Sequence, residues 1–166
     1  MKTIQSISKG VAYLIKVDDA DYGHLSQFKW TVIRTHGGVL YAKRRMSNQE
    51  GGKNSYMHHV IMGHPSKGMT IDHRDGDGLN NQRSNLRFAT IMENSRNQGK
   101  SKRNTSGFKG VSWDASGKKW RAAISVNNKS IGVGSFADIN DAARAYDAAA
   151  RKYHGEFANT NFRGDG

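Results

Sequence analysis

The segment Gly99–Gly107, which reads GKSKRNTSG, divides the chain and so limits what it can fold into. It has no large apolar residue, it is rich in Gly, Ser and Asn, and it carries Lys100, Lys102 and Arg103. Such a stretch cannot bury enough apolar surface to fold by itself. It therefore predicts a basic linker with a small domain on each side, and its charges could lie along a phosphate backbone.

Length and composition agree with two small domains, which we place at residues 1–98 and 106–162 with the linker at 99–105. The chain has 26 basic and 14 acidic residues, a net charge of +12, which favours a nucleic-acid partner. The sequence lacks the basic amphipathic helix that would favour a membrane surface. It has no cysteine, which excludes disulfides and zinc–thiolate sites. With no apolar run long enough to span a membrane and no signal peptide in Met1–Gly10, we expect a soluble, cytoplasmic protein.

The carboxy-terminal half has the clearer pattern of secondary structure. We predict strands at Phe108–Ser112, Lys119–Val126 and Lys129–Gly134, with an Asn127–Asn128 turn before the third. A helix follows, with Asp138 as its N-cap and Gly155 as its stop. Its apolar stripe comprises Ile139, Ala142, Ala143, Tyr146, Ala149, Ala150 and Tyr153. This half therefore predicts a three-stranded antiparallel sheet packed on one helix.

The amino-terminal half mixes short strands and helices, so the expected fold class of the chain is α+β. Two hairpins are predicted, Gln5–Ser8 with Val11–Val17, and Trp30–Ile33 with Val39–Lys43.

The stretch Thr70–Asn97 carries the candidate chemistry. A strand ends at Asp72–His73, a second strand covers Leu86–Ala89, and Thr90 with Glu93 forms a capping box for a helix to Asn97. A metal held between the first strand's end and this helix would take ligands from Asp72 and Asn94.

These residue types suit phosphodiester hydrolysis. Carboxylate and amide oxygens are hard ligands that suit Mg²⁺, and Mn²⁺ is the alternative. An imidazole beside the metal can take a proton from water near neutral pH. Adjacent residues on a strand point to opposite faces, however, so the strand has to end or twist at Asp72–His73 for both to serve one site.

The same stretch resembles the HNH (ββα-metal) nucleases of phages and mobile introns, through Asp72–His73, Asn85–Leu86–Arg87 and Glu93–Asn94. Tyr56–Met57–His58 resembles the family's preceding Tyr–x–His segment. The resemblance implies an N-terminal ββα-metal nuclease domain with His73 as general base and one divalent cation on Asp72 and Asn94. It also implies that Asn85 orients His73. His58 is expected either to support the site or to contact phosphate.

The carboxy-terminal half resembles the AP-two (ethylene-response-factor) DNA-binding domain, through Phe108–Lys109–Gly110–Val111, Trp120–Arg121–Ala122, Gly134–Ser135–Phe136, the helix Ala142–Ala150 and Asn161–Phe162. That family inserts its sheet into the major groove. Where its members often have arginine this chain has Lys109, Ser112, Ser125 and Ser130, and Gly132 replaces a typical tryptophan. Fewer arginines imply less direct reading of guanine. The residues expected to contact DNA are Arg87, Lys100, Lys102, Arg103, Lys109, Trp113, Lys118, Lys119, Arg121 and Lys129.

Together the two resemblances imply a metal-dependent endonuclease of double-stranded DNA, of the phage or homing type, encoded by a phage or mobile element in a bacterial host. Monomer and dimer both stay open. One alternative is a regulatory DNA-binding protein with a degenerate nuclease half. The other is an RNA-directed nuclease, although nothing in the sequence resembles an RNA-recognition module.

Overall fold

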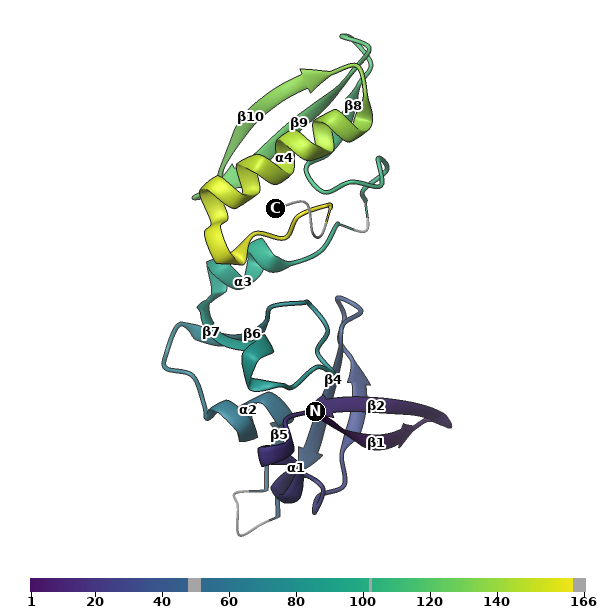
Figure 1. The fold of residues 1–166 in the computed structure, drawn as a ribbon, viewed down its shortest axis with the longest axis vertical. Helices are drawn as coiled ribbons and strands as arrows, with labels where there is room; N and C mark the ends of the chain where they lie inside the picture. Colours follow the sequence, from purple (N-terminus) through teal and green to yellow (C-terminus); the bar gives the residue numbers. More distant parts are fainter. Residues whose placement is uncertain (48–51, 102, 163–166) are drawn as a thin grey trace. The chain divides into compact units, whose positions relative to one another are not determined.

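The computed structural model describes residues 1–47, 52–101 and 103–162, and the chain forms two compact units, Met1–Asn94 and Ser95–Gly166 (Figure 1). The expected α+β class is confirmed. The first unit contains β1 (Lys2–Ser8), β2 (Val11–Val17), α1 (Asp19–Leu25), β3 (Thr31–Arg34), β4 (Leu40–Arg45), β5 (Asn54–Tyr56), α2 (Met57–Met62), β6 (Met69–His73), the 3₁₀ turn η2 (Arg83–Asn85) and β7 (Leu86–Thr90). Helix α3 (Ile91–Asn97) crosses the boundary. The second unit contains β8 (Val111–Asp114), β9 (Lys119–Val126), β10 (Lys129–Phe136), α4 (Ile139–His154) and the 3₁₀ turn η3 (Gly155–Phe157).

Three small antiparallel sheets build the first unit: β1–β2, β3–β4–β5 and β6–β7. The turn between β1 and β2 consists of Lys9 and Gly10, both with positive φ, which is the backbone that a two-residue hairpin of the natural twist requires. The predicted hairpins are present: β2 has the predicted bounds, β1 begins earlier than predicted, and β3 and β4 both begin one residue later and end later.

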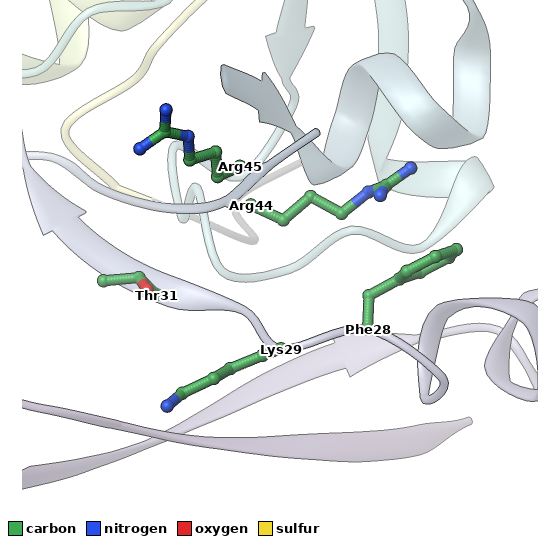
Figure 2. A pocket seen from close by; sticks show the side chains of 5 residues that line it. All are labelled: Phe28, Lys29, Thr31, Arg44 and Arg45. Carbon is green, nitrogen blue, oxygen red and sulfur yellow. The ribbon is translucent and has the colours of Figure 1, made fainter. Parts of the chain in front are cut away.

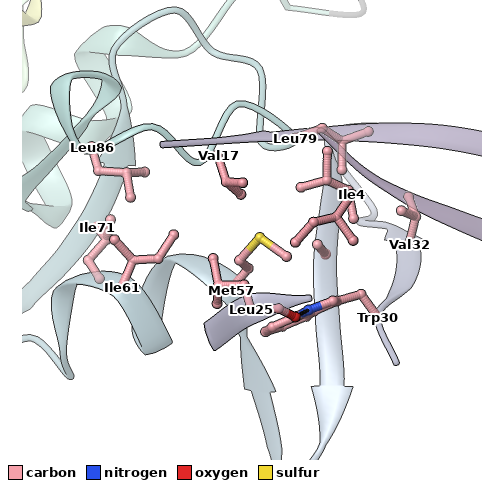
Figure 3. Close-up of a cluster of buried hydrophobic side chains, with 12 residues drawn as sticks. Ile4, Val17, Leu25, Trp30, Val32, Met57, Ile61, Ile71, Leu79 and Leu86 are labelled. Carbon is pink, nitrogen blue, oxygen red and sulfur yellow. Dashed lines mark hydrogen bonds between the residues drawn. The ribbon is translucent and has the colours of Figure 1, made fainter. Parts of the chain in front are cut away.

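The apolar core of the first unit gathers side chains from almost every element around Met57 (Figure 3). Met57 and Ile61 of α2 lie against Ile71 of β6 and Leu86 of β7, so the core fixes the hairpin that carries the candidate site. Trp30 closes the far side, where its indole N–H donates to the Leu25 carbonyl at 2.8 Å.

The hairpin β6–β7 followed by α3 gives the ββα order predicted for residues 70–97. The capping box is confirmed: the Thr90 N–H donates to Glu93 Oε2 at 2.8 Å, and the Glu93 N–H donates to Thr90 Oγ1 at 3.2 Å. These two bonds satisfy amide groups that the helix itself leaves without acceptors. The capping box therefore fixes where α3 begins, directly after β7.

The second unit is the predicted three-stranded sheet, in the order β10–β9–β8, with α4 packed on one face (Figure 1). Asp138 caps α4 by accepting from the N–H groups of Asn140 and Asp141. Asn127 and Asn128 have positive φ in the hairpin turn, as predicted. Asp147, buried in α4, also accepts from the backbone N–H groups of Asn161 and Phe162 and so anchors the tail.

The second unit differs from the prediction in strand bounds and in one residue of the helix stripe. The first strand begins at Val111 rather than Phe108, because Gly110 has a φ of 72° and lies against the Tyr146 ring, where a Cβ would come within 2.0 Å of it. The third strand continues to Phe136 through a bulge between Gly132 and Gly134. Tyr153 was expected in the buried stripe but is 40% exposed, because His154 instead turns inward at the helix end and contacts the Ser125 carbonyl.

Candidate active site

Strand β6 ends at His73, so the strand stops where the Asp72–His73 pair needs it to end for both side chains to serve one site. Asp72 pairs with Arg87 and His73 pairs with Leu86 across the β6–β7 ladder. Directly afterwards the Gly76 N–H donates to the His73 carbonyl at 2.9 Å, so the chain turns at this point. Both side chains are only 4% exposed.

The Asp72 carboxylate forms a buried ion pair with Arg87. Arg87 Nε and Nη2 both donate to Asp72 Oδ2, at 2.8 and 2.7 Å, and the Arg87 side chain is about as buried as its partner. A carboxylate taken out of water needs such a partner. The structure therefore turns the Arg87 guanidinium toward Asp72, which corrects its expected place among the DNA contacts.

The imidazole of His73 lies in an aromatic surround. Its ring centroid lies 5.5 Å from that of Tyr41 on β4 and 5.2 Å from that of His58 on α2. Burial lowers the pKa of His73, although a hydrogen bond to Asn81 and the carboxylates of Asp75, Asp72 and Asp77 act in the opposite direction. His73 is therefore uncharged near neutral pH, the form that can accept a proton.

His58, expected as a supporting residue, lies beside His73. Its ring stacks on Tyr56, with centroids 5.3 Å apart and an interplanar angle of 7°. Burial, followed by the neighbouring His73 and His59, lowers the pKa of His58 to about 3. The His58 ring is 8% exposed and flanks the His73 ring.

Asn85 holds the loop that follows His73. Its Nδ2 donates to Asp75 Oδ1 at 2.9 Å and to the Asn80 carbonyl at 2.8 Å, while its Oδ1 accepts from the Asp75 N–H at 3.0 Å. The described bonds of this side chain thus run to the loop, so any influence of Asn85 on the orientation of His73 passes through the loop.

The same loop packs closely on Tyr41. A Cβ at Gly78 would meet the Leu40 carbonyl oxygen at 2.2 Å and the Tyr41 ring at 2.7 Å, so only glycine fits. The loop also joins β2, because Lys16 N–H donates to the Leu79 carbonyl and the Asn81 N–H donates to the Lys16 carbonyl. The loop is therefore built into the sheet on one side and onto an aromatic ring on the other.

Asn94 lies half-buried on α3, the helix that begins as soon as β7 ends. Asp72 offers a buried carboxylate and Asn94 an amide oxygen, and this hard-oxygen donor set suits Mg²⁺ or Mn²⁺. Within the described ranges 1–47, 52–101 and 103–162, no three His, Cys, Asp or Glu side chains are grouped to hold a metal.

A separate pocket in the first unit is lined by Phe28, Lys29, Thr31, Arg44 and Arg45 (Figure 2). The Arg44 guanidinium lies over the Phe28 ring, 3.9 Å from its centroid. None of the expected site residues lines this pocket. The candidate active site is therefore identified by the residue types of Asp72 and His73 and not by this pocket.

Alternation along β8 and β9 defines the open face of the second sheet, the one that α4 does not cover. Arg121 and Lys119 of β9 pair with Ser112 and Asp114 of β8 on this face, and all but the half-buried Asp114 are exposed. Lys118 occupies the adjoining turn with a φ of 48°. The exposed Lys129 pairs with Val126, which places it on the helix side at the start of β10.

Two expected DNA contacts are placed differently by the structure. Trp113 pairs with Trp120 and follows Val111 by two residues, so it lies on the helix side of the sheet and not on the open face. It is 51% exposed and its ring makes an edge contact with Trp120 at 5.0 Å. The Lys109 ammonium donates to the carbonyls of Arg96 and Gln98, at 2.7 and 2.5 Å, and burial lowers its pKa to about 8.

The expected linker contains hydrogen-bonded turns. Lys100 Nζ donates to the Gly107 carbonyl at 2.5 Å, and the Gly107 N–H donates to Asn104 Oδ1 at 2.8 Å. Arg103 is exposed, and Lys102 lies outside the described residues.

Two family profiles match the chain in the places where these two sites lie. An HNH endonuclease profile matches residues 56–96, and an AP2 domain profile matches residues 106–156. Protein 3.8 of Escherichia phage T7 is 40% identical over 92 residues, which cover 55% of this chain and 75% of the phage protein. The chain therefore contains an HNH endonuclease domain and an AP2 domain.

Two further relatives are similar to this chain, one over most of its length and one over a shorter stretch. An uncharacterized HNH endonuclease of Acanthamoeba polyphaga mimivirus is 28% identical over 160 residues, covering 96% of this chain and 79% of the relative. An AP2/ERF and B3 domain-containing protein of Oryza sativa subsp. japonica is 43% identical over 60 residues, covering 36% of this chain and 16% of the relative. The HNH and AP2 domains give the chain a nuclease function and a DNA partner. Across the described part of the chain, no helix is long and apolar enough to cross a membrane.

Sequence reasoning missed some residues of the site. Tyr41 reaches His73 only through the tertiary packing of β4, and nothing in the local sequence signals it. Tyr56 had a signal in the Tyr–x–His run, where it was noted without a role. The Asn81 side chain, in the loop that follows His73, is completely buried.

Proposed function

We propose that the chain is a metal-dependent DNA endonuclease in which His73 is the general base and Asp72 and Asn94 are the ligands of one divalent cation. The observation that carries this proposal is the buried, uncharged imidazole of His73 next to the buried carboxylate of Asp72, at the point where β6 ends. An HNH profile over the same residues supports it.

His73 takes the proton of the attacking water on a ring nitrogen as the new bond between that oxygen and phosphorus forms. The bond between phosphorus and the 3′ oxygen then breaks, which leaves a 5′ phosphate on one product, and the departing 3′ oxygen takes a proton from water to become the 3′ hydroxyl of the other. Tyr41 and His58 flank the imidazole, and Tyr56 stacks on His58, so this cluster limits the access of bulk water to His73. A bound Mg²⁺ or Mn²⁺ would supply positive charge to the phosphate oxygens and the departing oxygen.

Arg87 and Asn85 position this machinery. Arg87 holds Asp72 through Oδ2 and fixes the carboxylate in its buried place. Asn85 braces the loop between residues 75 and 80, which follows the general base directly. We assign to both a structural part in the site and not direct contact with DNA.

For the second unit we propose that the open face of the sheet contacts DNA, with Lys119, Arg121 and Lys118 as its cationic residues. Lys129, Lys100 and Arg103 would add phosphate contacts from neighbouring segments. Such a unit increases the local concentration of DNA at the nuclease unit without forming part of its chemistry. Because one active site cuts one strand, a monomer should nick duplex DNA, and a double-strand break would need two copies or two events.

The test is a supercoiled-plasmid assay with Mg²⁺, with Mn²⁺ and with a chelator, run beside a matched RNA substrate. The proposal predicts nicked circles with either metal and intact plasmid with the chelator. Intact DNA binding without nicking under any metal would favour the regulatory alternative, and cleavage confined to RNA would overturn the DNA assignment.

A further inference from the structure

One face of the β3–β4–β5 sheet carries a row of side chains that begins at the candidate active site. Side chains alternate between the two faces of a strand, so Tyr41, Lys43 and Arg45 of β4 share a face. The other face carries Ala42 and packs into the core of the unit. The Tyr41 ring centroid is 5.5 Å from that of His73, so this end of the row lies at the active site.

The row becomes more accessible with distance from His73. Tyr41 and Lys43 are half-buried, whereas Arg45 is exposed and pairs with the exposed Asn54 of β5. A strand rises about 3.3 Å per residue, so Lys43 and Arg45 lie about 7 Å and about 13 Å from Tyr41 along β4. Two cations therefore follow one another on the same face, from the active site toward solvent.

The charge around this face is of one sign. Between Tyr22 and Ile71 the sequence has seven lysine and arginine residues and one acidic residue, Glu50. Strands β3, β4 and β5 contain no Asp or Glu at all. A surface with this excess of positive charge attracts a polyanion.

Arg44 and Arg45 are adjacent but differ in their surroundings. The Arg44 guanidinium lies over the Phe28 ring, whereas the Arg45 side chain extends to the other side of the strand (Figure 2). In the part of the chain that the structure describes, the ion pairs involve neither Lys43 nor Arg45. The charges of these two residues are therefore available to phosphate groups of a ligand.

The pocket beside Arg45 adds further donors to this face. Lys29 and Thr31 line it together with Arg45 (Figure 2). Thr31 pairs with Lys43, so its hydroxyl lies on the same face as the row. Ammonium, guanidinium and hydroxyl groups are the usual donors to the phosphate oxygens of nucleic acids.

We propose that this face binds the backbone of the DNA strand that is cut, with Lys43 and Arg45 contacting phosphates next to the one that reacts at His73. The inference rests on the proposed function and adds the path of the substrate to it. A DNA strand advances about 3.4 Å per nucleotide, so the two cations reach phosphates about two and about four nucleotides from the cut. Such contacts fix the register of the strand and read no bases.

The first experiment measures binding of the full-length, metal-free protein to duplex DNA by fluorescence anisotropy over a salt series. Lys43→Gln and Arg45→Gln should each weaken binding and reduce the slope of log affinity against log salt by about 1, because each removes one phosphate contact. Unchanged slopes in both variants would overturn the inference. Weaker binding to a matched RNA duplex, with DNA binding unchanged, would overturn it as well.

Lys53→Gln is the matched control for the loss of charge. Lys53 is exposed, directly precedes β5, and its carbonyl accepts from the Met46 N–H. It is therefore one residue out of phase with Asn54 and lies on the other face of the sheet. The control should leave the slope unchanged, and an effect equal to that of Arg45→Gln would count against a specific contact.

The second experiment uses the absence of cysteine from the sequence, which allows one introduced cysteine to carry a photo-crosslinker. Asn54→Cys places the label beside Arg45 on the proposed face, and Lys53→Cys places it on the other face. We expect crosslinks to DNA mainly from Asn54→Cys, within about four nucleotides of the nick. Equal yields from the two variants, or crosslinks far from the nick, would contradict the proposed path.

The two experiments separate this inference from the proposed function. If the half-buried Lys43 makes Lys43→Gln fail to fold, the exposed Arg45 and the crosslinks still decide the inference. If the unmodified protein does not nick DNA, the proposed function fails, while the salt slopes and crosslink yields still report whether this face binds DNA. If the protein nicks DNA with unchanged slopes and equal crosslinks, only the inference fails.

Discussion

At the scale of single residues, the site depends on how buried charges are compensated. Asp72 is paired with Arg87 on one oxygen, and the neighbouring imidazoles of His73 and His58 stay uncharged. Such a site places a buried, ion-paired carboxylate next to uncharged imidazoles. Its stability should therefore respond both to the loss of Arg87 and to pH.

Arg87→Met tests whether Asp72 is a metal ligand. Removing one partner of a buried ion pair leaves an uncompensated carboxylate, and we expect the free energy of unfolding of the metal-free protein to fall by about 3 kcal/mol. If Asp72 binds the cation, Mg²⁺ or Mn²⁺ should recover part of that loss, because it supplies the missing positive charge. Urea unfolding with and without metal measures both effects. An equal loss at all metal concentrations would contradict the assignment.

His58 predicts a dependence of stability on pH. Its folded-state pKa of about 3 lies below the unfolded value of 6.5, so between these values the unfolded chain binds a proton that the folded chain does not. Stability is therefore unaffected by His58 above pH 6.5 and falls by roughly 1 kcal/mol per pH unit as pH drops toward 3. Urea unfolding of the protein and of His58→Phe, at pH 7 and pH 5, should show a smaller loss in the variant. Equal losses would contradict this burial of a neutral histidine.

At the scale of elements, β6, β7 and α3 bring Asp72, His73 and Asn94 into one ββα unit. The local signals for this unit are strong, and the capping box at Thr90–Glu93 is formed as predicted. Local signals likewise placed β9, the Asn127–Asn128 turn and the Asp138 cap. They placed the start of β8 wrongly, because the packing of Gly110 against Tyr146 is a contact between distant segments.

The same distinction applies to the site. The spacing of Asp72, His73, Asn85 and Asn94 is visible in the sequence, and their assigned roles remain predictions. Tyr41 and Asn81 could not be assigned, because their relation to His73 depends on β4 and on the pairing of the loop with Lys16. The burial of Arg87 could not be predicted from the sequence either, because a basic residue in a motif gives no sign of whether it faces a carboxylate or solvent.

Thr90→Ala tests the link between the capping box and metal binding. Losing an N-cap costs about 1 kcal/mol of helix stability, and α3 is only seven residues long. Because Asn94 lies on this helix, we expect weaker binding of Mn²⁺, measured by calorimetry on the full-length protein. Ser112→Ala, in the second unit, serves as the control. Unchanged affinity in a measurably destabilised Thr90→Ala would show that Asn94 is not a ligand or does not depend on the cap.

At the scale of the whole molecule, the chain combines a nuclease unit with a DNA-binding unit and carries a net charge of +12. The excess of basic over acidic residues predicts that the chain binds DNA tightly and that this binding weakens with salt, because each phosphate contact releases condensed counterions. The small and hydroxylated residues on the open face of the second sheet, among them Ser112, Ala123, Ser125 and Ser130, leave few groups for reading bases. We therefore expect affinity rather than strong sequence specificity from this unit.

Arg121→Ala and Lys119→Ala test the open face. Each should weaken DNA binding and reduce the slope of log affinity against log salt by about 1, across different DNA sequences. Lys152→Ala removes the same charge from α4, which covers the opposite face of the sheet, and should leave the slope unchanged. Fluorescence anisotropy over a salt series makes the comparison. If all three substitutions have an equal effect, either DNA contacts another surface or its binding depends on net charge alone.

In the proposed mechanism His73 activates the water that cuts DNA. Its most direct test is the rate of supercoiled-plasmid nicking by His73→Ala with Mg²⁺ or Mn²⁺, beside DNA affinity measured on the same preparation. We predict a loss of nicking by at least about a hundredfold with affinity nearly unchanged, because the substitution removes the base and none of the proposed DNA contacts. Nicking by folded His73→Ala at the rate of the unmodified protein would contradict the account.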